Sequence, residues 1–458
     1  MPARTRLGEK VCSDGAGSNT IAGMKFITLV LLTLFSTSPA WAQKAPLPYR
    51  MQPYALDSGL HSSVAGEAAT RVASSKVVTV PGSPWLRLNF SGIALGRASY
   101  LTITSLYDGA QQRLDARALA QWKNSSAYFN GDALRIDLHV ASGDKNVFAR
   151  MTEVMVGNME APASQCGPTD DRTASTDVRT GRLLTIGCTA WLIADGRFVS
   201  AGHCVSSAGS ANTVQFNVPP SLPNGTIQHP GPEDQYVVDD ATRVFSNNGV
   251  GNDWGVFETL PNAQTGLTAL QAQGASFNLV QNLGPATIRI TGYGVDSGTA
   301  NQTNQTHTGP NAGSSGTTMR YQTDTEGGNS GSPVIDEATG NAVGVHTHGG
   351  CSTSGGGNNS GTSTFNTAFW AQVGNTTGGD IDLTARARSR GSVNTVLLRW
   401  DPSDGGDMNV LRNNVVVQTT PDDGKTQDNL GSMTGTFTYK VCETDSGDCS
   451  NEVVVTLP

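Results

Sequence analysis

The sequence predicts an all-β protein with several domains, and three observations support this prediction. Short segments that alternate apolar and polar residues recur along the chain, as in WLRLNF, YLTITSL and TIRITGYGV. A period of two residues is typical of strands with one buried face. The connecting segments are rich in Gly, Asn and Thr, and the chain contains 54 Gly. At 458 residues the chain is too long for one ordinary core, so about three domains are expected.

The composition narrows the classes of partner. Charged residues make up 15% of the chain, and the formal net charge is -8 with a pI near 5.4. A nucleic-acid partner would require a basic patch, and the sequence predicts none. The chain also lacks the long Lys or Arg runs that bind anionic membranes. We expect a monomer that needs no cofactor.

The first 42 residues are expected to be absent from the folded protein. From Met24, one Lys precedes the apolar run FITLVLLTLF and the segment STSPAWA, in which Ala40 and Ala42 match a secretory cleavage pattern. The apolar run is short for a membrane span, so no membrane anchor is expected. Cleavage after Ala42 would leave Gln43 first in a secreted protein, extracellular or periplasmic. Residues 1–23 form an upstream segment, with the start expected at Met24.

The cysteines indicate disulfides. Of seven, Cys12 lies in the upstream segment, and the six that remain are an even number, which in an oxidising compartment indicates disulfide pairing. Metal binding is the competing interpretation. Cys442 and Cys449 are separated by ETDSGD, which is too long for a CxxC ligand pair, and no His lies near them. No metal site is predicted.

Residues 43–165 are expected to form a leader and a small sandwich. The leader, 43–75, has no sustained period and is predicted to be flexible, with ordered structure starting near Val77. Four period-two segments then predict an antiparallel sandwich that serves as a prodomain or a binding domain. His61 and His139 are isolated there and carry no predicted chemistry.

Residues 166–375 alternate short strands with long loops, which predicts a double β-barrel or a sandwich. The segment VGNTTGGD then predicts a linker. In the remaining region, 376–458, four period-two strands carry a Trp early and a Tyr late. This region resembles a fibronectin type III domain, which implies a seven-stranded sandwich for binding or spacing. The resemblance also places a Cys442–Cys449 disulfide across its last hairpin.

Three segments of the central region supply the groups that acyl transfer by serine requires: a hydroxyl, an imidazole and a carboxylate. FVSAGHC contributes His203, NDWGVF contributes Asp253 and GGNSGSP contributes Ser330. The acid is the least certain member, because other aspartates also lie between His203 and Ser330, among them Asp234, Asp239, Asp240 and Asp296. Asp253 is favoured because an apolar strand follows it directly, which suits burial against an imidazole.

The order His, Asp, Ser and the motifs AGHC and GNSGSP resemble the chymotrypsin-like serine proteases, and more narrowly the bacterial glutamyl endopeptidases. The resemblance implies a double β-barrel and a serine endopeptidase that cleaves proteins or peptides through an acyl-enzyme. It also implies an oxyanion hole formed by the backbone N–H groups of Gly328 and Ser330. A disulfide between Cys188 and Cys204 behind the histidine is implied as well. The remaining cysteines, Cys166 and Cys351, form the third expected pair.

Two hypotheses compete for the specificity pocket. Asp324 lies where a trypsin-like enzyme would hold the carboxylate that binds Lys or Arg side chains. Thr325 and His346 lie where glutamyl endopeptidases bind an acidic side chain, and an imidazole and a hydroxyl can donate hydrogen bonds to it. The TDT and GVHT contexts favour cleavage after Glu or Asp. Asn329 replaces the aspartate that pairs with a freed N-terminus in trypsin, so that activation switch is not expected. A protease fold without activity, serving as an adhesive or scaffold protein, is the alternative from another functional class.

Overall fold

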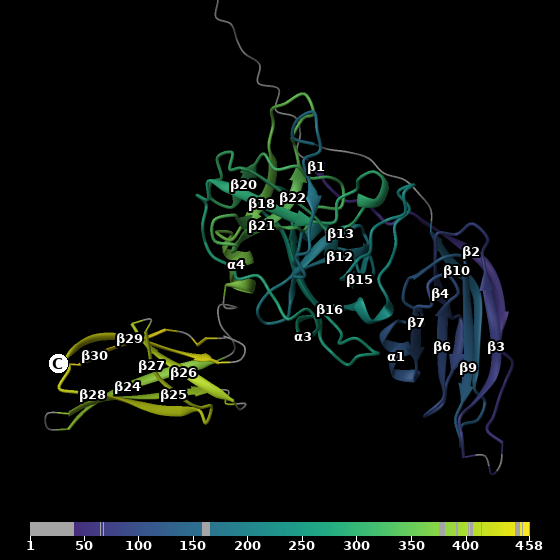
Figure 1. Ribbon diagram of the computed structural model, residues 1–458, viewed down its shortest axis with the longest axis horizontal. Helices are drawn as coiled ribbons and strands as arrows, with labels where there is room; N and C mark the ends of the chain where they lie inside the picture. The colour runs from purple at the N-terminus through teal and green to yellow at the C-terminus, as the bar shows by residue number, and fades with distance from the viewer. Residues whose placement is uncertain are drawn as a thin grey trace, which may run out of the picture. The chain divides into compact units, whose positions relative to one another are not determined.

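The structure is a computed structural model that describes residues 41–64, 66, 68–157, 165–374, 381–390, 393–401, 403, 406–413, 415–444, 449, 450 and 452–457. The upstream segment, the signal peptide as far as Ala40 and residues 375–380 of the expected linker lie outside this range. The described parts form antiparallel sheets with a few short helices, so the predicted all-β class is confirmed (Figure 1).

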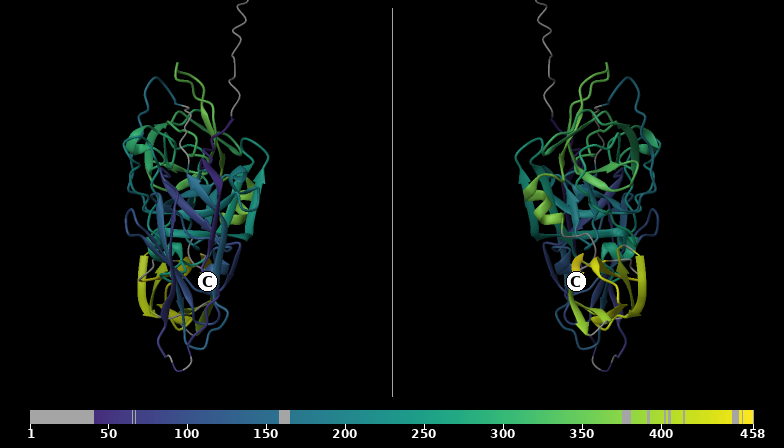
Figure 2. Two further views of the ribbon diagram at one scale, coloured as in Figure 1. Left: turned by 90° about the vertical axis from the view of Figure 1, so that its right-hand side faces the viewer. Right: turned by 90° about the vertical axis from the view of Figure 1, so that its left-hand side faces the viewer.

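The N-terminal region folds into two sheets around one apolar core, whose purple and blue strands can be followed in Figure 1 and from the sides in Figure 2. The core includes Leu86, Leu101 and Ile136, each at most 3% exposed. One sheet contains β2 (Tyr49–Asp57), β10 (Phe148–Gly157), β4 (Trp85–Asn89), β8 (Phe129–Asn130) and β5 (Gly92–Ala94). The other contains β3 (Arg71–Thr79), β9 (Ala133–Val140), β6 (Tyr100–Ser105) and β7 (Gln111–Leu114), followed by helix α1 (Ala116–Gln121).

The prediction of a flexible leader over 43–75 was wrong. β2 pairs with β10 along its length, and β3 pairs with β9. β2 is an edge strand that contains Pro53, and the register shifts beside that residue. Proline is tolerated at such edges and bulges because it has no N–H to donate. The side chains of Tyr54 and Leu56 pack against the core from this strand. A strand that is only half buried and interrupted by Pro gives a weak sequence pattern.

The central region begins with a closed barrel of six strands. Around the barrel they run β12 (Thr180–Thr185), β13 (Cys188–Leu192), β14 (Phe198–Ser200), β17 (Asp253–Thr259), β16 (Gln235–Asn247) and β15 (Ala211–Gln215). Its interior holds buried Phe198, Phe216 and Phe257. The one-turn helix α2 (Gly202–Val205) follows β14, and the sheet contact of β14 with β17 brings the start of β17 beside that helix.

An eight-stranded sheet forms the second half of the central region and curls as a half-barrel rather than closing. Its path is β11 (Thr173–Ala174), β19 (Gln305–Pro310), β18 (Thr287–Gly292), β21 (Pro333–Asp336), β22 (Ala342–Gly349), β23 (Asn359–Ser363) and β20 (Thr318–Tyr321). The eighth strand, β1 (Trp41–Ala42), pairs with β22, as Figure 1 shows. Other short elements are α3 (Ala269–Gln273), α4 (Thr367–Val373), η1 (Pro232–Asp234) and η2 (Gly298–Ala300). A closed barrel and a half-barrel in this order form the chymotrypsin-like fold expected from the sequence.

The C-terminal region forms sheets of three and four strands over a core that includes Trp400 and Tyr439. The first sheet contains β24 (Asp382–Arg390), β25 (Val393–Asp401) and β28 (Lys425–Gly431). The second contains β27 (Val415–Pro421), β26 (Asp407–Arg412), β29 (Gly435–Glu443) and β30 (Val453–Leu457). The period-two pattern predicts four strands here, and the two sheets together contain seven.

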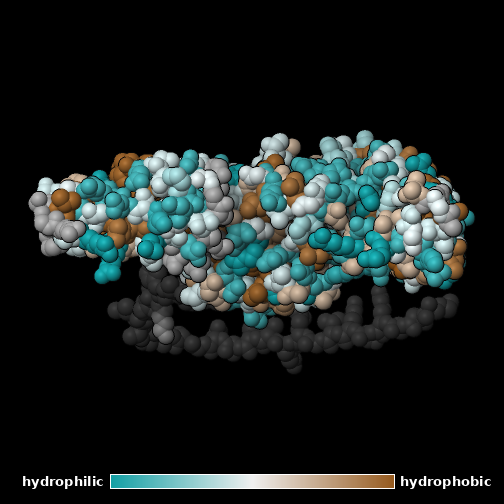
Figure 3. All heavy atoms as spheres, turned by 90° about the horizontal axis from the view of Figure 1, so that it is seen from below, coloured by the Kyte–Doolittle hydropathy of each residue, from teal (hydrophilic) through white to brown (hydrophobic). Residues whose placement is uncertain are grey.

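On the face shown in Figure 3, hydrophobic side chains are scattered among hydrophilic ones. Single exposed apolar residues such as Leu60 and Val415 are normal on a protein surface. Among the helices in the described parts of the chain, none has the length and apolar character needed to cross a membrane.

Candidate active site

His203 and Asp253 are held together by the pairing of β14 with β17. His203 lies in α2, and Asp253 is the first residue of β17. One carboxylate oxygen of Asp253 accepts a hydrogen bond from the His203 backbone N–H at 2.9 Å, and the other lies 2.6 Å from His203 Nδ1. Both residues are buried, with exposures of 7% and 0%. Because the carboxylate accepts the Nδ1 proton, the imidazole presents Nε2 as a base.

The second sheet fixes Asp253 from the other side. The backbone N–H of Asp253 donates to Thr362 Oγ1, and that hydroxyl donates to the Asp253 carbonyl oxygen. His348 also lies nearby, with its Nδ1 3.9 Å from the Asp253 carboxylate. Burial lowers the pKa of His348, while the charge of Asp253 opposes that shift. The carboxylate is therefore positioned by strands of both halves of the fold.

Ser330 lies in the loop before β21, where the backbone approaches the first barrel closely. A Cβ atom added at Gly331 would lie 2.1 Å from the Thr189 carbonyl oxygen, and Gly331 has a φ of +91°. Only glycine suits such a position. Ser330 Oγ donates to the Thr347 carbonyl oxygen at 3.1 Å and accepts from the backbone N–H of Gln43 at 2.9 Å. His203 Nε2 is buried and makes no hydrogen bond within the described part of the chain.

The backbone N–H groups of Gly328 and Ser330 point at the same oxygen. They donate to the carbonyl oxygen of Gln43 at 2.7 and 3.3 Å. Gly328 has a φ of +102°, which aims its N–H into the site and favours glycine there. The two donors expected from the sequence thus converge on one carbonyl. Sequence reasoning did not anticipate that this carbonyl would belong to the chain itself.

The side chain of Gln43 contacts His346 and Thr325, the two residues that the sequence predicts to bind the substrate side chain. His346 Nε2 lies 2.5 Å from Gln43 Oε1, and Gln43 Nε2 donates to the backbone carbonyl of Thr325 at 3.3 Å. The other ring nitrogen of His346 lies 2.6 Å from the Tyr321 hydroxyl. The hydroxyl of Thr325 accepts from Asn359 Nδ2, so Thr325 contacts Gln43 through its backbone instead of its side chain.

His346 is 0% exposed, so its ring lies entirely inside the fold. Burial, followed by the nearby His348 and His203, lowers the pKa of His346 to about 3. The imidazole is therefore neutral over the whole physiological range of pH. Burial also raises the pKa of Tyr321 well above its usual value, so its hydroxyl keeps its proton.

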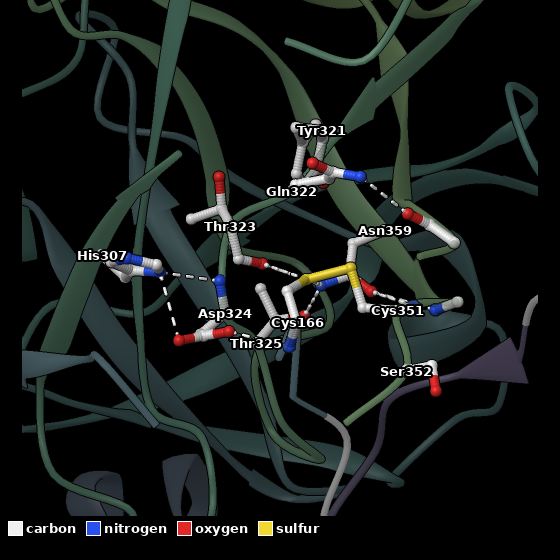
Figure 4. The surroundings of a disulfide bond; sticks show 12 residues. Cys166, His307, Tyr321, Gln322, Thr323, Asp324, Thr325, Cys351, Ser352 and Asn359 are labelled. Atoms are coloured by element: carbon white, nitrogen blue, oxygen red, sulfur yellow. Dashed lines mark hydrogen bonds and ion pairs between the residues drawn. A yellow bond between two sulfur atoms is a disulfide. The ribbon is translucent and has the colours of Figure 1, made fainter. Parts of the chain in front are cut away.

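The carboxylate of Asp324 is directed at another part of the chain. It accepts hydrogen bonds from the backbone N–H groups of Cys166 and Asp171, each at 2.8 Å, and its own N–H donates to His307 Nδ1. Figure 4 shows Asp324 between His307 and Cys166. This geometry gives Asp324 no contact with the Gln43 side chain among the described residues.

Among the residues that the structure describes, two groups lie close enough together to act as metal ligands. Cys188, His203 and Cys204 form one, but the two cysteines are joined in a disulfide and cannot act as thiolate ligands. Asp171, His307 and Asp324 form the other, and their ligand atoms lie within 4.8 Å of one another. Both oxygens of Asp324 also accept backbone hydrogen bonds, from Cys166 and Asp171.

The structure contains the three cysteine pairs expected from the sequence: Cys188–Cys204, Cys166–Cys351 and Cys442–Cys449. The first joins β13 to α2 directly after His203. The second ties the start of the central region to the loop after β22, beside Asn359 (Figure 4). Two of the three disulfides therefore support the segments that carry the site.

The central region is similar to known proteases. Residues 188–345 match the model of the trypsin-like peptidase domain. A glutamyl endopeptidase of Bacillus licheniformis is 28% identical over 202 residues, covering 39% of this chain and 60% of the relative. The chain therefore spans less than two thirds of the length of that curated relative.

Among solved structures, a Glu endopeptidase in complex with MPD is 22% identical, with a TM-score of 0.35 and coverage of 45% of this chain and 97% of that one. The protease Anisep from Arthrobacter nicotinovorans is 17% identical, with a TM-score of 0.33 and coverage of 44% and 98%. The family match spans His203, Asp253 and Ser330. The chain is thus similar to the trypsin-like peptidase domain over the residues that form the candidate active site.

Proposed function

We propose that the protein is a secreted serine endopeptidase. Ser330 is the nucleophile, His203 the general base and acid, and Asp253 the group that orients His203. The backbone N–H groups of Gly328 and Ser330 form the oxyanion hole. The match to a trypsin-like peptidase domain supports the reaction class.

One observation carries the proposal: a single backbone carbonyl, that of Gln43, accepts from both Gly328 N and Ser330 N while Ser330 Oγ contacts the N–H of the same residue. A peptide bond bound this way has its carbonyl polarised at the serine. A protease fold retained only as a scaffold has no need for two converging donors beside a buried His–Asp pair. The enzyme is therefore favoured over the inactive alternative.

Each residue of the site has a role in one step of the reaction. His203 Nε2 takes the Ser330 proton as Oγ attacks the substrate carbonyl, and Asp253 stabilises the imidazolium that forms. The two backbone donors stabilise the oxyanion, and such a donor often lowers the barrier by about 3 kcal/mol. His203 then protonates the leaving amine, and water hydrolyses the acyl-enzyme.

For specificity, we propose a side chain of glutamate size with a polar end before the scissile bond, with Glu and Asp as the favoured residues. Support comes from His346 and Thr325, which line the pocket, and from the similarity to a protein named glutamyl endopeptidase. The competing Lys or Arg specificity would need the Asp324 carboxylate in the pocket, whereas both of its oxygens accept backbone hydrogen bonds.

The N-terminal and C-terminal sandwiches have roles other than catalysis. We propose that the N-terminal sandwich belongs to a precursor, as in a zymogen. The C-terminal sandwich, by its resemblance to fibronectin type III domains, serves binding or spacing. We expect the mature protein to be an extracellular or periplasmic monomer that acts on protein or peptide substrates.

The test uses peptides that differ only in the residue before the scissile bond: Glu, Asp, Lys, Arg and Phe. Wild type should cleave the acidic peptides fastest, and Ser330→Ala should abolish cleavage while the protein still folds. His346→Ala should reduce kcat/KM for acidic peptides, and Asp324→Ala, provided that it folds, should not change the order of preference. Turnover by Ser330→Ala would refute the assignment of Ser330 as the nucleophile. Fast cleavage after Lys or Arg that is lost in Asp324→Ala would refute the proposed preference for Glu and Asp.

A further inference from the structure

Residues 41–47 pass through the candidate active site, and both ends of this segment form backbone hydrogen bonds with the central region. On one side β1 pairs with β22, with Trp41 opposite Gly349 and Ala42 opposite His348. On the other side, Ala45 N donates to the Gly187 carbonyl and Leu47 N to the Thr185 carbonyl, each at 2.9 Å. A peptide held by antiparallel pairing on both sides of a serine is bound in the manner of a substrate.

Gln43 lies at the centre of this segment, and each of its polar groups has a partner. Its N–H donates to Ser330 Oγ, its carbonyl oxygen accepts from Gly328 N and Ser330 N, and its side chain bonds His346 and Thr325. Gln43 is 3% exposed, whereas the next residue, Lys44, is exposed. The Gln43–Lys44 bond is therefore the peptide bond whose carbonyl lies in the oxyanion hole.

Two glycines of the protease domain make room for this segment. A Cβ atom at Gly187 would lie 1.6 Å from the carbonyl oxygen of Ala45. A Cβ atom at Gly349 would lie 2.5 Å from Gln43 Nε2 and 2.9 Å from Gln43 Cδ. Such distances are impossible for any other residue without movement. The cleft therefore accommodates the backbone on one side of the bond and the glutamine side chain on the other.

We propose that the Gln43–Lys44 bond is a self-processing site, cleaved by Ser330 of the same chain while Trp41 and Ala42 are still attached and pair with β22, and that the pocket accepts glutamine. The inference rests on the proposed function. Ser330 Oγ bonds to the Gln43 carbonyl carbon, the bond from that carbon to the Lys44 nitrogen breaks, and the Oγ proton passes through His203 to the new amine. Water then adds to the acyl-enzyme, restores the Ser330 hydroxyl and leaves Gln43 with a free carboxylate. Lys44 becomes the N-terminus.

The hydrogen-bond pattern of the pocket suits a carboxamide. Tyr321 keeps its proton and donates to His346 Nδ1, so a neutral His346 carries its proton on Nε2 and donates to Gln43 Oε1. The amide nitrogen of Gln43 donates in turn to the Thr325 carbonyl. A carboxylate could accept the hydrogen bond from His346, but its second oxygen would lie against the Thr325 carbonyl oxygen, which is also an acceptor. Because the pocket carries no fixed positive charge on His346, it does not require an acidic side chain.

The first test identifies the N-terminus of the secreted full-length protein by mass spectrometry of its terminal peptide. Wild type should begin at Lys44, and Ser330→Ala should begin at Gln43 or earlier. Lys44→Pro removes the amide hydrogen and stiffens the bond, so it should also retain Gln43, whereas the matched Lys44→Ala should be processed. An active wild type that retains Gln43 would overturn the proposal. So would a start at Ala45 or processing of the Ser330→Ala protein at Lys44.

The second test supplies the site in trans, as the peptide SPAWAQKAPLP, which copies residues 38–48. The enzyme should cleave it between Gln and Lys with a kcat/KM within about tenfold of the Glu-substituted peptide. Replacing Gln with Ala should reduce kcat/KM at least tenfold, since a methyl side chain has no group to bond His346. If the Glu peptide were hydrolysed more than a hundredfold faster than the Gln peptide, the proposal that the pocket accepts glutamine would be refuted, but the proposed function would stand. Failure to cleave any peptide would instead refute the proposed function.

Discussion

Gly349→Ala tests the pocket geometry with the smallest possible change. Gly349 has no left-handed φ, so the substitution acts through space and not through backbone strain. The new Cβ atom would lie 2.5 Å from Gln43 Nε2, whereas ordinary contacts begin near 3.4 Å. A bound Gln or Glu side chain must therefore retreat by about 1 Å, which lengthens the 2.5 Å contact with His346 Nε2 to the limit of a hydrogen bond.

Losing this buried hydrogen bond should cost about 1 to 3 kcal/mol, which corresponds to a loss of roughly 5- to 150-fold in kcat/KM. The assay compares Gln, Glu and Ala before the scissile bond, and the Ala peptide should lose little because its side chain does not pass residue 349. Gly284→Ala is the matched control, since its Cβ would meet only Asn282 Oδ1 at 3.8 Å. An equal loss for all three peptides, or no loss for Gln and Glu, would refute this account of the pocket.

Three further predictions concern the triad and the stability of the flanking structure. Asp253→Asn should reduce kcat by roughly a thousandfold or more with little change in KM, because an amide can donate to Nδ1 and hold the wrong tautomer; near wild-type kcat would contradict the assignment. Replacing Cys188 and Cys204 together by Ala removes a loop closure over 16 residues and should lower the free energy of unfolding by about 3 kcal/mol in denaturant titration. Burial raises the pKa of Asp144, but hydrogen bonds from the backbone N–H groups of Arg97, Ala98 and Ser99 and from the Ser99 hydroxyl outweigh burial and lower it from 3.8 to about 2. This carboxylate thus stabilises the fold above about pH 4 and loses that effect as the pH falls through 2, so Asp144→Asn should cost about 1 to 2 kcal/mol at pH 7 and a shrinking amount below pH 4.

The parts of the site that local sequence could predict are those carried by compact motifs. Asp253 begins an apolar strand, His203 follows shortly after one, and Ser330 lies shortly before another. That local pattern reflects where the fold needs them. The glycine at 328 also indicates an unusual backbone conformation, because few residues other than glycine adopt a φ of +102°. Such signals lie within a few residues of the group that they position.

The contacts that the sequence could not predict join distant segments. The occupation of the pocket by Gln43 depends on the pairing of β1 with β22, which are about 300 residues apart, and two-residue strands have no periodicity to detect. The ordering of 49–57 depends similarly on β10, because an edge strand with a proline lacks a strong pattern of its own. The role of Asp324 was left open by the sequence, since only the folded chain shows that Cys166 and Asp171 bind its carboxylate.

The central claim is that Ser330 is a nucleophile activated by His203, and site-mapped labelling with a fluorophosphonate probe tests it most directly. Only an activated serine reacts quickly with this reagent. Wild type should gain one label, located on the peptide that contains Ser330, while Ser330→Ala gains none and His203→Ala reacts at a strongly reduced rate. An unlabelled wild type, or a label on another residue that persists in Ser330→Ala, would contradict the assignment.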